Sequence, residues 1–355
     1  MDIIYSICSW GFGHATRSLP VLRKLIEENH TITVISHGRT LKLLQKELGD
    51  TVSYEDIPDY PILISKNTEQ FIAKSIVYWP YFIKRMEDGV QHLKKILETT
   101  PCDRIISDGR YDMYSRSIPS IFISHQMRIM NPLRFKLFER GSETFNLFFF
   151  KRFRDIIVPD YKENDLTGDL SHNLRKIDEN KLHYVGLLSD FEKKDQKKDI
   201  DYFFSISGPE PQRSYLEQTI MEQIGAIDGH IVITLGKTEE HDHPELDHIQ
   251  IYPYLPKEKR EEILNRSKLV ISRSGYSTIM DLAVIGTKAL MIPTPGQIEQ
   301  QYLAAYLSEK QLCHQVPQHA LDLGKDTALA QQTKGFHSNG SVDLTVDNIL
   351  DIILN

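Results

Sequence analysis

Short apolar segments that alternate with longer segments of helical periodicity are the feature that most constrains how this chain can fold. In the first half, strand-like runs at residues 3–8 and 31–36 are each followed by a segment with helical spacing of apolar side chains, at residues 19–28 and 40–48. Such alternation favours a parallel sheet with helices on both faces, because each crossover helix returns the chain to the same edge. We therefore expect an α/β chain with Rossmann-like, doubly wound sheets.

The same pattern begins again after a charged segment at residues 187–201, which has the composition of a solvated linker. With 355 residues and 40% hydrophobic content, the chain can fill two cores. We predict two domains that face a cleft, at residues 1–186 and 200–335. A final amphipathic helix at 342–355 is expected to return to the first domain. Further strands are expected at residues 104–106, 121–123, 155–158, 202–207, 231–235, 249–252, 269–272 and 289–292, and further helices at 213–224 and 278–285.

Charge and cysteine content narrow the functional classes. With 49 acidic and 42 basic side chains, the formal net charge of −7 gives no bulk attraction to nucleic acid. The three cysteines lie far apart without metal-ligand spacing, which fits a reducing compartment. The first residues lack the basic region of a secretory signal, and no run approaches the roughly 18 apolar residues of a membrane span. We expect a cytoplasmic protein, either soluble or peripheral at the inner face of the membrane.

A glycine-rich loop follows the first predicted strand. Gly11 and Gly13 stand at the start of a helix, and His14 and Arg17 follow them. Ligands bind at this edge of an open α/β sheet, where the helix N-terminus favours anions. A nicotinamide dinucleotide is not expected, since Arg17 replaces the third glycine of that fingerprint. A histidine with its ordinary pKa of about 6.5 suits proton abstraction, so His14 is our candidate base and Asp108 the carboxylate that orients it. The alternative is that His14 only caps or packs.

A second loop of this kind opens the second half, at residues 207–214. Gly208 permits close approach of the backbone to a ligand, and the following helix offers free amides. Arg213 adds a planar cation that suits phosphate. Taken alone, this stretch is compatible with a phosphate site and with a plain turn.

The most specific pattern spans residues 272–281 and 292–301. A loop of small residues precedes a helix and suits a diphosphate, and Asp281 can accept hydrogen bonds from both ribose hydroxyls. Gln300 and Gln301 offer amide groups to sugar hydroxyls. The predicted donor-binding residues are Gly208, Arg213, Arg273, Ser274, Gly275, Tyr276, Ser277, Asp281, Gln300 and Gln301.

Residues 274–304 resemble the donor-site signature of glycosyltransferase family 28, the family of the lipid II-forming N-acetylglucosaminyltransferases. The resemblance implies a GT-B fold, a uridine nucleotide-sugar donor and no divalent metal or other cofactor. It also implies that Asp281 binds the ribose, that residues 274–275 form the diphosphate loop and that residues 300–301 contact the donor sugar. The absence of an Asp-x-Asp motif after a predicted strand agrees with metal independence.

The predicted acceptor loops match this family less fully. Gly11, Gly13 and His14 match its N-terminal glycine-rich loop. His125 and Gln126 are similar to its His-Glu-Gln-Asn segment, but the glutamate and the asparagine are missing here. The acceptor is therefore not defined by the resemblance, and a lipid-linked glycan is one candidate.

The function predicted from these residues is inverting transfer of a hexose from a UDP-sugar, for example UDP-N-acetylglucosamine, to a hydroxyl acceptor. Loop amides, the helix dipole and Arg213 or Arg273 would stabilise the leaving diphosphate. A nucleotide-sugar hydrolase, a nucleotide-sugar 2-epimerase and a non-catalytic nucleotide-sugar-binding module remain as alternatives.

Two further stretches allow two interpretations each. His241, His243 and their acidic neighbours contain zinc-ligand types but lack the regular helical spacing of hydrolytic zinc motifs, so we expect a polar loop. Residues 76–85, 134–140 and 148–154 mix aromatic and basic side chains. They either fill the first core or dock on an anionic membrane.

Overall fold

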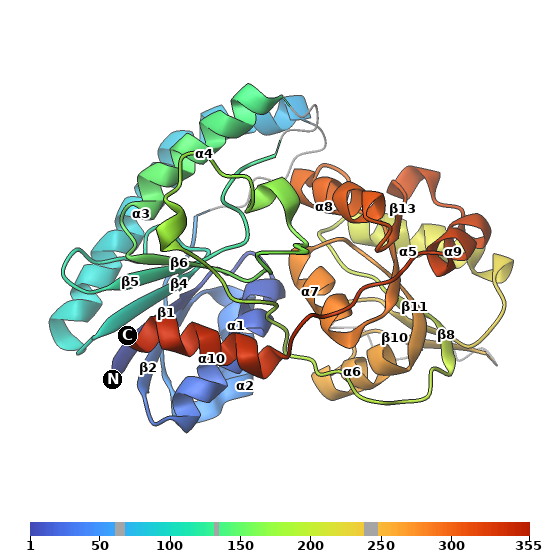
Figure 1. Cartoon of the computed structure of the whole chain (residues 1–355), viewed down its shortest axis with the longest axis horizontal. Helices are drawn as coiled ribbons and strands as arrows, with labels where there is room; N and C mark the ends of the chain where they lie inside the picture. The colour runs from blue at the N-terminus through green and yellow to red at the C-terminus, as the bar shows by residue number, and fades with distance from the viewer. Residues whose placement is uncertain (61–67, 131–134, 238–247) are drawn as a thin grey trace. The chain divides into compact units, whose positions relative to one another are not determined.

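The computed structural model of the chain contains two compact α/β units (Figure 1). Unit 1 comprises Met1–Asp190 and Gly340–Asn355, and unit 2 comprises Phe191–Asn339. Each is built on a parallel sheet, with seven strands described in unit 1 and six in unit 2. The predicted fold class of two doubly wound α/β sheets is confirmed. The structure describes residues 1–60, 68–130, 135–237 and 248–355.

The sheet of unit 1 has the strand order β3-β2-β1-β4-β5-β6-β7. The order reverses between β1 and β4, and ligands of such sheets bind beyond the carboxyl ends of the strands at this switch point. The register places Ile7 beside Asp108, and Asp108 beside Ile123. The strands are β1 Asp2–Ile7, β2 Thr31–Ser36, β3 Ser53–Asp56, β4 Arg104–Asp108, β5 Ser120–Ile123, β6 Asp155–Val158 and β7 Leu182–Tyr184.

Helices cover both faces of this sheet, with α3 and α4 on the face opposite α1, α2 and α10 (Figure 1). The C-terminal helix α10 packs on α1. Its last carbonyls accept hydrogen bonds from arginines, Ile353 from Arg104 Nε over 3.0 Å and Ile352 from Arg154 Nη2 over 2.8 Å. None of the described helices combines the length and the apolar content that crossing a membrane requires. The helices are α1 Phe12–Glu27, α2 Gly38–Leu48, α3 Thr68–Thr99, α4 Lys136–Phe150 and α10 Val342–Leu354.

The sheet of unit 2 has the order β10-β9-β8-β11-β12-β13, which reverses between β8 and β11. Its central strands are buried on both faces, as their continuous apolar sequences require: Phe203, Phe204 and Leu269 are each 0% exposed. The strands are β8 Ile200–Ser205, β9 Ile231–Thr234, β10 Ile249–Tyr252, β11 Ser267–Ser272, β12 Lys288–Met291 and β13 His314–Gln315. The helices are α5 Gln212–Gln223, α6 Lys257–Arg266, α7 Tyr276–Ile285, α8 Ile298–Glu309 and α9 Leu323–Gln331.

The predicted linker at residues 187–201 is too long at both ends, since Leu187 and Leu188 are each 1% exposed and belong to unit 1. Ile200 and Asp201 form the start of β8, because Ile200 is an apolar side chain that is buried in the sheet at 1% exposure. The strand predicted at residues 202–207 correspondingly ends at Ser205, and the next residues belong to the loop that follows.

Candidate active site

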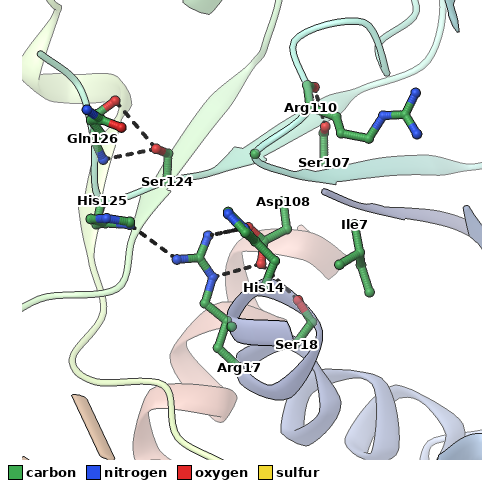
Figure 2. A network of polar contacts seen from close by, with 12 residues as sticks. Ile7, His14, Arg17, Ser18, Ser107, Asp108, Arg110, Ser124, His125 and Gln126 are labelled. Carbon is green, nitrogen blue, oxygen red and sulfur yellow. Dashed lines mark hydrogen bonds and ion pairs between the residues drawn. The ribbon is translucent and has the colours of Figure 1, made fainter. Parts of the chain in front are cut away.

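A cluster of polar side chains forms where β1 and β4 end, at the switch point of unit 1 (Figure 2). Asp108 ends β4, and its Oδ1 lies 2.7 Å from Nδ1 of His14 in the first turn of α1. Arg17 donates from Nε to Asp108 Oδ2 over 2.9 Å and also contacts Oδ1. Ser18 Oγ donates to Oδ2 over 2.9 Å, and Arg17 Nη1 lies 3.2 Å from Nδ1 of His125 in the loop after β5. The structure thus brings together the predicted residues of three separate loops.

The charge of Asp108 decides which nitrogen of His14 carries a proton. Burial by itself raises the pKa of Asp108, but Arg17 and His14 more than offset this effect, so that its pKa lies well below the ordinary value. The ionised carboxylate can only accept hydrogen bonds. Nδ1 of His14 must therefore donate across the 2.7 Å contact, which leaves Nε2 of the neutral ring as a proton acceptor. Arg17 Nη2 is 3.0 Å from the same Nδ1, and we assign this as a close contact, since a donating nitrogen cannot also accept.

The ring of His14 is held against the backbone of Gly109. This glycine has a φ of +76°, and a Cβ on it would lie 2.8 Å from His14 Cε1 and 3.1 Å from Cys8 Cβ. A side chain at position 109 would therefore displace the histidine, besides straining the backbone. Sequence reasoning missed Gly109, although it directly follows Asp108.

The loop before α1 rests on a buried ion network that the sequence analysis did not predict. Arg110 is 0% exposed and contacts Asp59 over 3.0 Å and Asp112 over 2.7 Å. Asp59 Oδ2 in turn accepts from the backbone N–H of Ser9 over 2.5 Å. Removal of Asp59 would take away the acceptor of the Ser9 N–H underneath the loop and leave Arg110 paired with Asp112. The signal in the sequence is the charged run of residues 108–112 directly after an apolar strand.

The remaining predicted loop residues lie around this cluster. Gly11 is the residue that caps α1, and Gly13 lies in its first turn. Gln126 contacts Ser124 in the described structure, with its backbone N–H donating to Ser124 Oγ over 3.0 Å (Figure 2). Its role in acceptor recognition stays a prediction.

The second predicted site lies at the switch point of unit 2. Gly275 caps α7, so the first amides of this helix have no intrahelical partners. Ser274 Oγ donates to the carbonyl of Gln300 over 2.8 Å, and Oε1 of Gln300 accepts from the N–H of Thr294 over 2.9 Å. Gln300 therefore joins the loop after β11 to the loop after β12.

The two predicted cationic residues of this site have different partners. Arg213 contacts the carboxylates of Glu210 and Glu217, the latter over 3.2 Å, and donates to a backbone carbonyl. Its charge is thus neutralised within α5 and the loop before it. A bound diphosphate would have to compete with both carboxylates for this guanidinium.

Arg273 is 2% exposed, and its guanidinium donates to backbone carbonyls of the loops after β8 and β12 and of the first residue of α5. Nε donates to Ser207 over 3.3 Å, Nη1 to Ile292 over 3.1 Å and Nη2 to Gln212 over 2.8 Å. Burial lowers the pKa of Arg273 to about 10, so it remains charged at neutral pH. A Cβ on Gly208, whose φ is +118°, would lie 3.6 Å from Arg273 Nε. The glycine thus lets the first loop pass close to the buried cation.

The other predicted donor residues lie on α7 and α8. Asp281 and Ser277 are partly exposed on α7, and Gln301 is exposed on α8. The side chain of Tyr276 is 2% exposed and belongs to the core, so a ligand can meet this residue only through its backbone.

A metal-ligand cluster lies after β6, among the residues that the structure describes. It consists of Asp160, Asp165 and His172, whose ligand atoms lie within 4.8 Å of one another. Asp160 already accepts from the backbone N–H of Thr167 over 3.0 Å and contacts His172 Nε2 over 3.2 Å, so it anchors its own loop. Residues 241–245, where a zinc site was set aside, lie outside the described residues.

The chain matches the glycosyltransferase family 28 C-terminal domain over residues 211–342, and glycosyl transferase family 1 over residues 1–118. The first match contains the loop at Ser274, and the second contains His14 and Asp108. Both candidate sites thus lie in segments that match glycosyltransferase families.

Similar proteins agree with these matches. An uncharacterized glycosyltransferase of Methanosarcina acetivorans is 24% identical in an alignment of 332 residues that covers 87% of this chain and 84% of the relative. A UDP-N-acetylglucosamine--N-acetylmuramyl-(pentapeptide) pyrophosphoryl-undecaprenol N-acetylglucosamine transferase of Histophilus somni is 43% identical over 58 residues, or 16% of each chain. The solved structure of MurG from Acinetobacter baumannii has a TM-score of 0.62 at 14% identity and covers 99% of each chain, which shows a common fold.

Fold, family matches and relatives define the class of the protein as a glycosyltransferase with the GT-B fold. More particularly, it is a family 28-like glycosyltransferase, as the residues around Ser274 predicted.

Proposed function

We propose that the chain is an inverting hexosyltransferase that moves a sugar from a UDP-sugar, such as UDP-N-acetylglucosamine, to an acceptor hydroxyl. The observation that carries this proposal is the 2.7 Å contact of His14 with the buried, ionised Asp108. Nε2 of His14 takes the hydroxyl proton while Asp108 stabilises the resulting imidazolium. The acceptor oxygen bonds to the anomeric carbon as the bond to the diphosphate oxygen breaks on the opposite face, so UDP leaves and the configuration inverts.

The donor is proposed to bind to unit 2 without a metal or other cofactor. The N-terminus of α7 and the buried cation of Arg273 support this, because the positive end of a helix dipole and a cation both stabilise the charge of a diphosphate. Asp281 is assigned to the ribose and the pair at residues 300–301 to the sugar, by resemblance to family 28.

A membrane-bound acceptor is supported by α4, which buries several polar side chains and exposes several apolar ones. Glu143 and Asn146 are buried, and Glu143 accepts from Arg128 over 2.9 Å. Leu137 and Phe148 are 69% and 62% exposed. Exposed apolar surface mixed with cations is typical of docking on anionic lipid. The exposed apolar residues are Val77, Tyr78, Trp79, Tyr81, Phe135, Leu137, Phe138 and Phe148, and exposed cations among them are Lys84, Lys136, Arg140 and Lys151.

Aromatic contacts connect this apolar face to the loop before α1. Trp79 of α3 stacks on Phe82 at 5.5 Å between ring centroids, Phe82 contacts Tyr60 at 4.7 Å, and Tyr60 contacts Trp10 at 5.4 Å. Helices α3 and α4 lie side by side (Figure 1), and Trp79 also contacts Phe145 of α4 at 5.2 Å. These contacts join α3 and α4 to the glycine-rich loop through the buried Tyr60, so the lipid part of an amphipathic acceptor on α3 and α4 would lie near that loop. We therefore propose a lipid-linked hydroxyl acceptor.

Transfer is tested by incubating the protein with radiolabelled UDP-sugars and a total membrane lipid extract. We expect label in the organic phase with wild type and none with His14→Ala, while His14→Ala still binds UDP. Full activity of His14→Ala would overturn the assignment of the base. Release of free labelled sugar at the same rate with and without lipid would identify a hydrolase instead.

Membrane docking is tested by co-sedimentation with vesicles of phosphatidylglycerol at low salt. The double variant Leu137→Glu/Phe148→Glu should lose sedimentation. The matched control is Leu344→Glu on α10, where Leu344 is 57% exposed on the opposite side of the sheet. Equal sedimentation of both variants, or none with wild type, would contradict a membrane role for α3 and α4.

A further inference from the structure

Trp10 is a rigid and half-exposed aromatic residue in the loop before α1. Its side chain is 42% exposed, although its indole N–H is bound, donating to the carbonyl of Tyr60 over 2.7 Å. Tyr60 also meets the indole edge to face, with planes at 88°. The backbone on both sides is fixed, since Thr40 Oγ1 donates to the carbonyls of Ser9 and Gly11 over 3.3 and 3.4 Å. The indole is thus held by the ring of Tyr60 and by its own N–H group, and it keeps a large exposed surface.

Tyr60, which holds Trp10, also contacts the residue against which His14 packs. Tyr60 is 3% exposed and its hydroxyl donates to the carbonyl of Gly109 over 2.8 Å. Gly109 is the residue against which the ring of His14 packs. The position of the indole and the position of the imidazole are therefore fixed by one set of contacts.

The neighbourhood of Trp10 also contains charged side chains. Phe12 is 38% exposed and has the guanidinium carbon of Arg39 at 5.2 Å from its ring centre. The first turns of α1, which come next in the chain, carry His14 and Arg17, the two residues that contact Asp108. A ligand that binds on this loop would meet an exposed indole together with charged groups, so it should offer an apolar face with polar groups around its rim. A pyranose ring has this shape, with C–H groups on its face and hydroxyls at its edge, and C–H groups are attracted to the negative face of an aromatic ring.

We propose that Trp10 is the platform on which the acceptor's own sugar ring stacks, so that the acceptor is a glycoside and its ring hydroxyl, not a lipid alcohol, reaches His14. The inference rests on the proposed transfer reaction but concerns the acceptor alone. The low conformational freedom of a fixed indole reduces the entropy that a bound ring has to lose.

The chain contains two tryptophans, so the fluorescence of Trp10 can be isolated. In Trp79→Phe, emission comes from Trp10. We expect saturable changes in this emission with millimolar methyl pyranosides from a panel of glucoside, galactoside, mannoside and N-acetylglucosaminide. Cyclohexanol and octanol, as apolar alcohols, should give none. Trp10→Phe, which retains Trp79, is the matched control and should not respond to any pyranoside.

Kinetics separate this role from a structural one. With the lipid extract as acceptor source, Trp10→Ala should raise the acceptor KM at least about tenfold, while the UDP-induced thermal shift stays at the wild-type value; Trp10→Phe should lie between. The proposal is overturned if no pyranoside changes Trp10 emission, if the alcohols do so equally, or if Trp10→Ala changes kcat with the acceptor KM unaltered. A lack of donor binding would instead refute the proposed function. The fluorescence titration needs no donor, so it would still test the role of Trp10.

Discussion

Replacing Asp108 with Asn removes the central charge of the His14 cluster while keeping the size of the side chain. Asp108 is 0% exposed and Arg17 is 3% exposed, so the variant leaves a buried guanidinium without its counter-charge. Breaking a buried pair from one side costs about 3–5 kcal/mol. In a domain of roughly 150–250 residues, each kcal/mol lowers Tm by about 2–4 °C. We therefore expect Asp108→Asn to unfold about 10 °C below wild type in differential scanning calorimetry.

The pH dependence of this difference follows from the direction of the pKa shift. The pKa of Asp108 is lower in the folded than in the unfolded state, so its contribution to stability is complete above the ordinary pKa near 4 and is lost as pH falls below it. Asp108→Asn has no such group. The gap in Tm between wild type and variant should thus be widest near neutral pH and shrink below about pH 4.

A second substitution separates stability from catalysis. Arg17→Met in the Asp108→Asn background removes the buried cation, so much of the lost stability should return. Turnover should stay about 10²- to 10⁴-fold below wild type in both variants, because His14 has lost the carboxylate that orients it. Additive losses of Tm in the double variant, or wild-type turnover in Asp108→Asn, would refute this reasoning.

Three further predictions concern the two sites. Gly109→Ala should lower kcat at least about tenfold, because a Cβ would lie 2.8 Å from His14 Cε1, and steady-state kinetics would show it. Arg273→Met should weaken UDP about tenfold and uridine less than about twofold in calorimetric titrations, since the cation is proposed to act on the phosphates. Arg266→Met, whose arginine pairs with Asp199, is the control. Turnover should be the same in magnesium and in chelator, and a loss in chelator would contradict the metal-independent donor site.

The sequence predicted the central strands of both sheets because central parallel strands have continuous apolar runs, but it missed the short edge strands β3, β7 and β13. Loops after such strands gather at one sheet edge, which is why His14 and Asp108 could be paired although 94 residues separate them. The direct contact itself depends on the register of β1 and β4, in which Ile7 lies beside Asp108. Register between distant strands has no local signal in a single sequence.

Other features could not be predicted for physical reasons. Helix α4 has buried polar residues such as Asn146 and exposed apolar ones such as Phe148, so its hydrophobic pattern does not indicate the buried face. The ion network of Arg110 joins residues about 50 positions apart and becomes visible only when the chain is folded. Arg213 and Arg273 look equivalent as candidate cations in the sequence, but the carboxylates around Arg213 distinguish them.

The central claim is that this family 28-like protein binds a uridine diphosphate sugar without a metal, and a thermal-shift panel tests it most directly. Ligand at about 100 times its Kd stabilises the folded state by roughly 2.7 kcal/mol, which corresponds to a rise in Tm of roughly 5–10 °C. We predict such a rise with UDP and UDP-sugars, equal in magnesium and in chelator, retained in His14→Ala and lost in Asp281→Ala. No rise with any nucleoside diphosphate or its sugar would contradict the account.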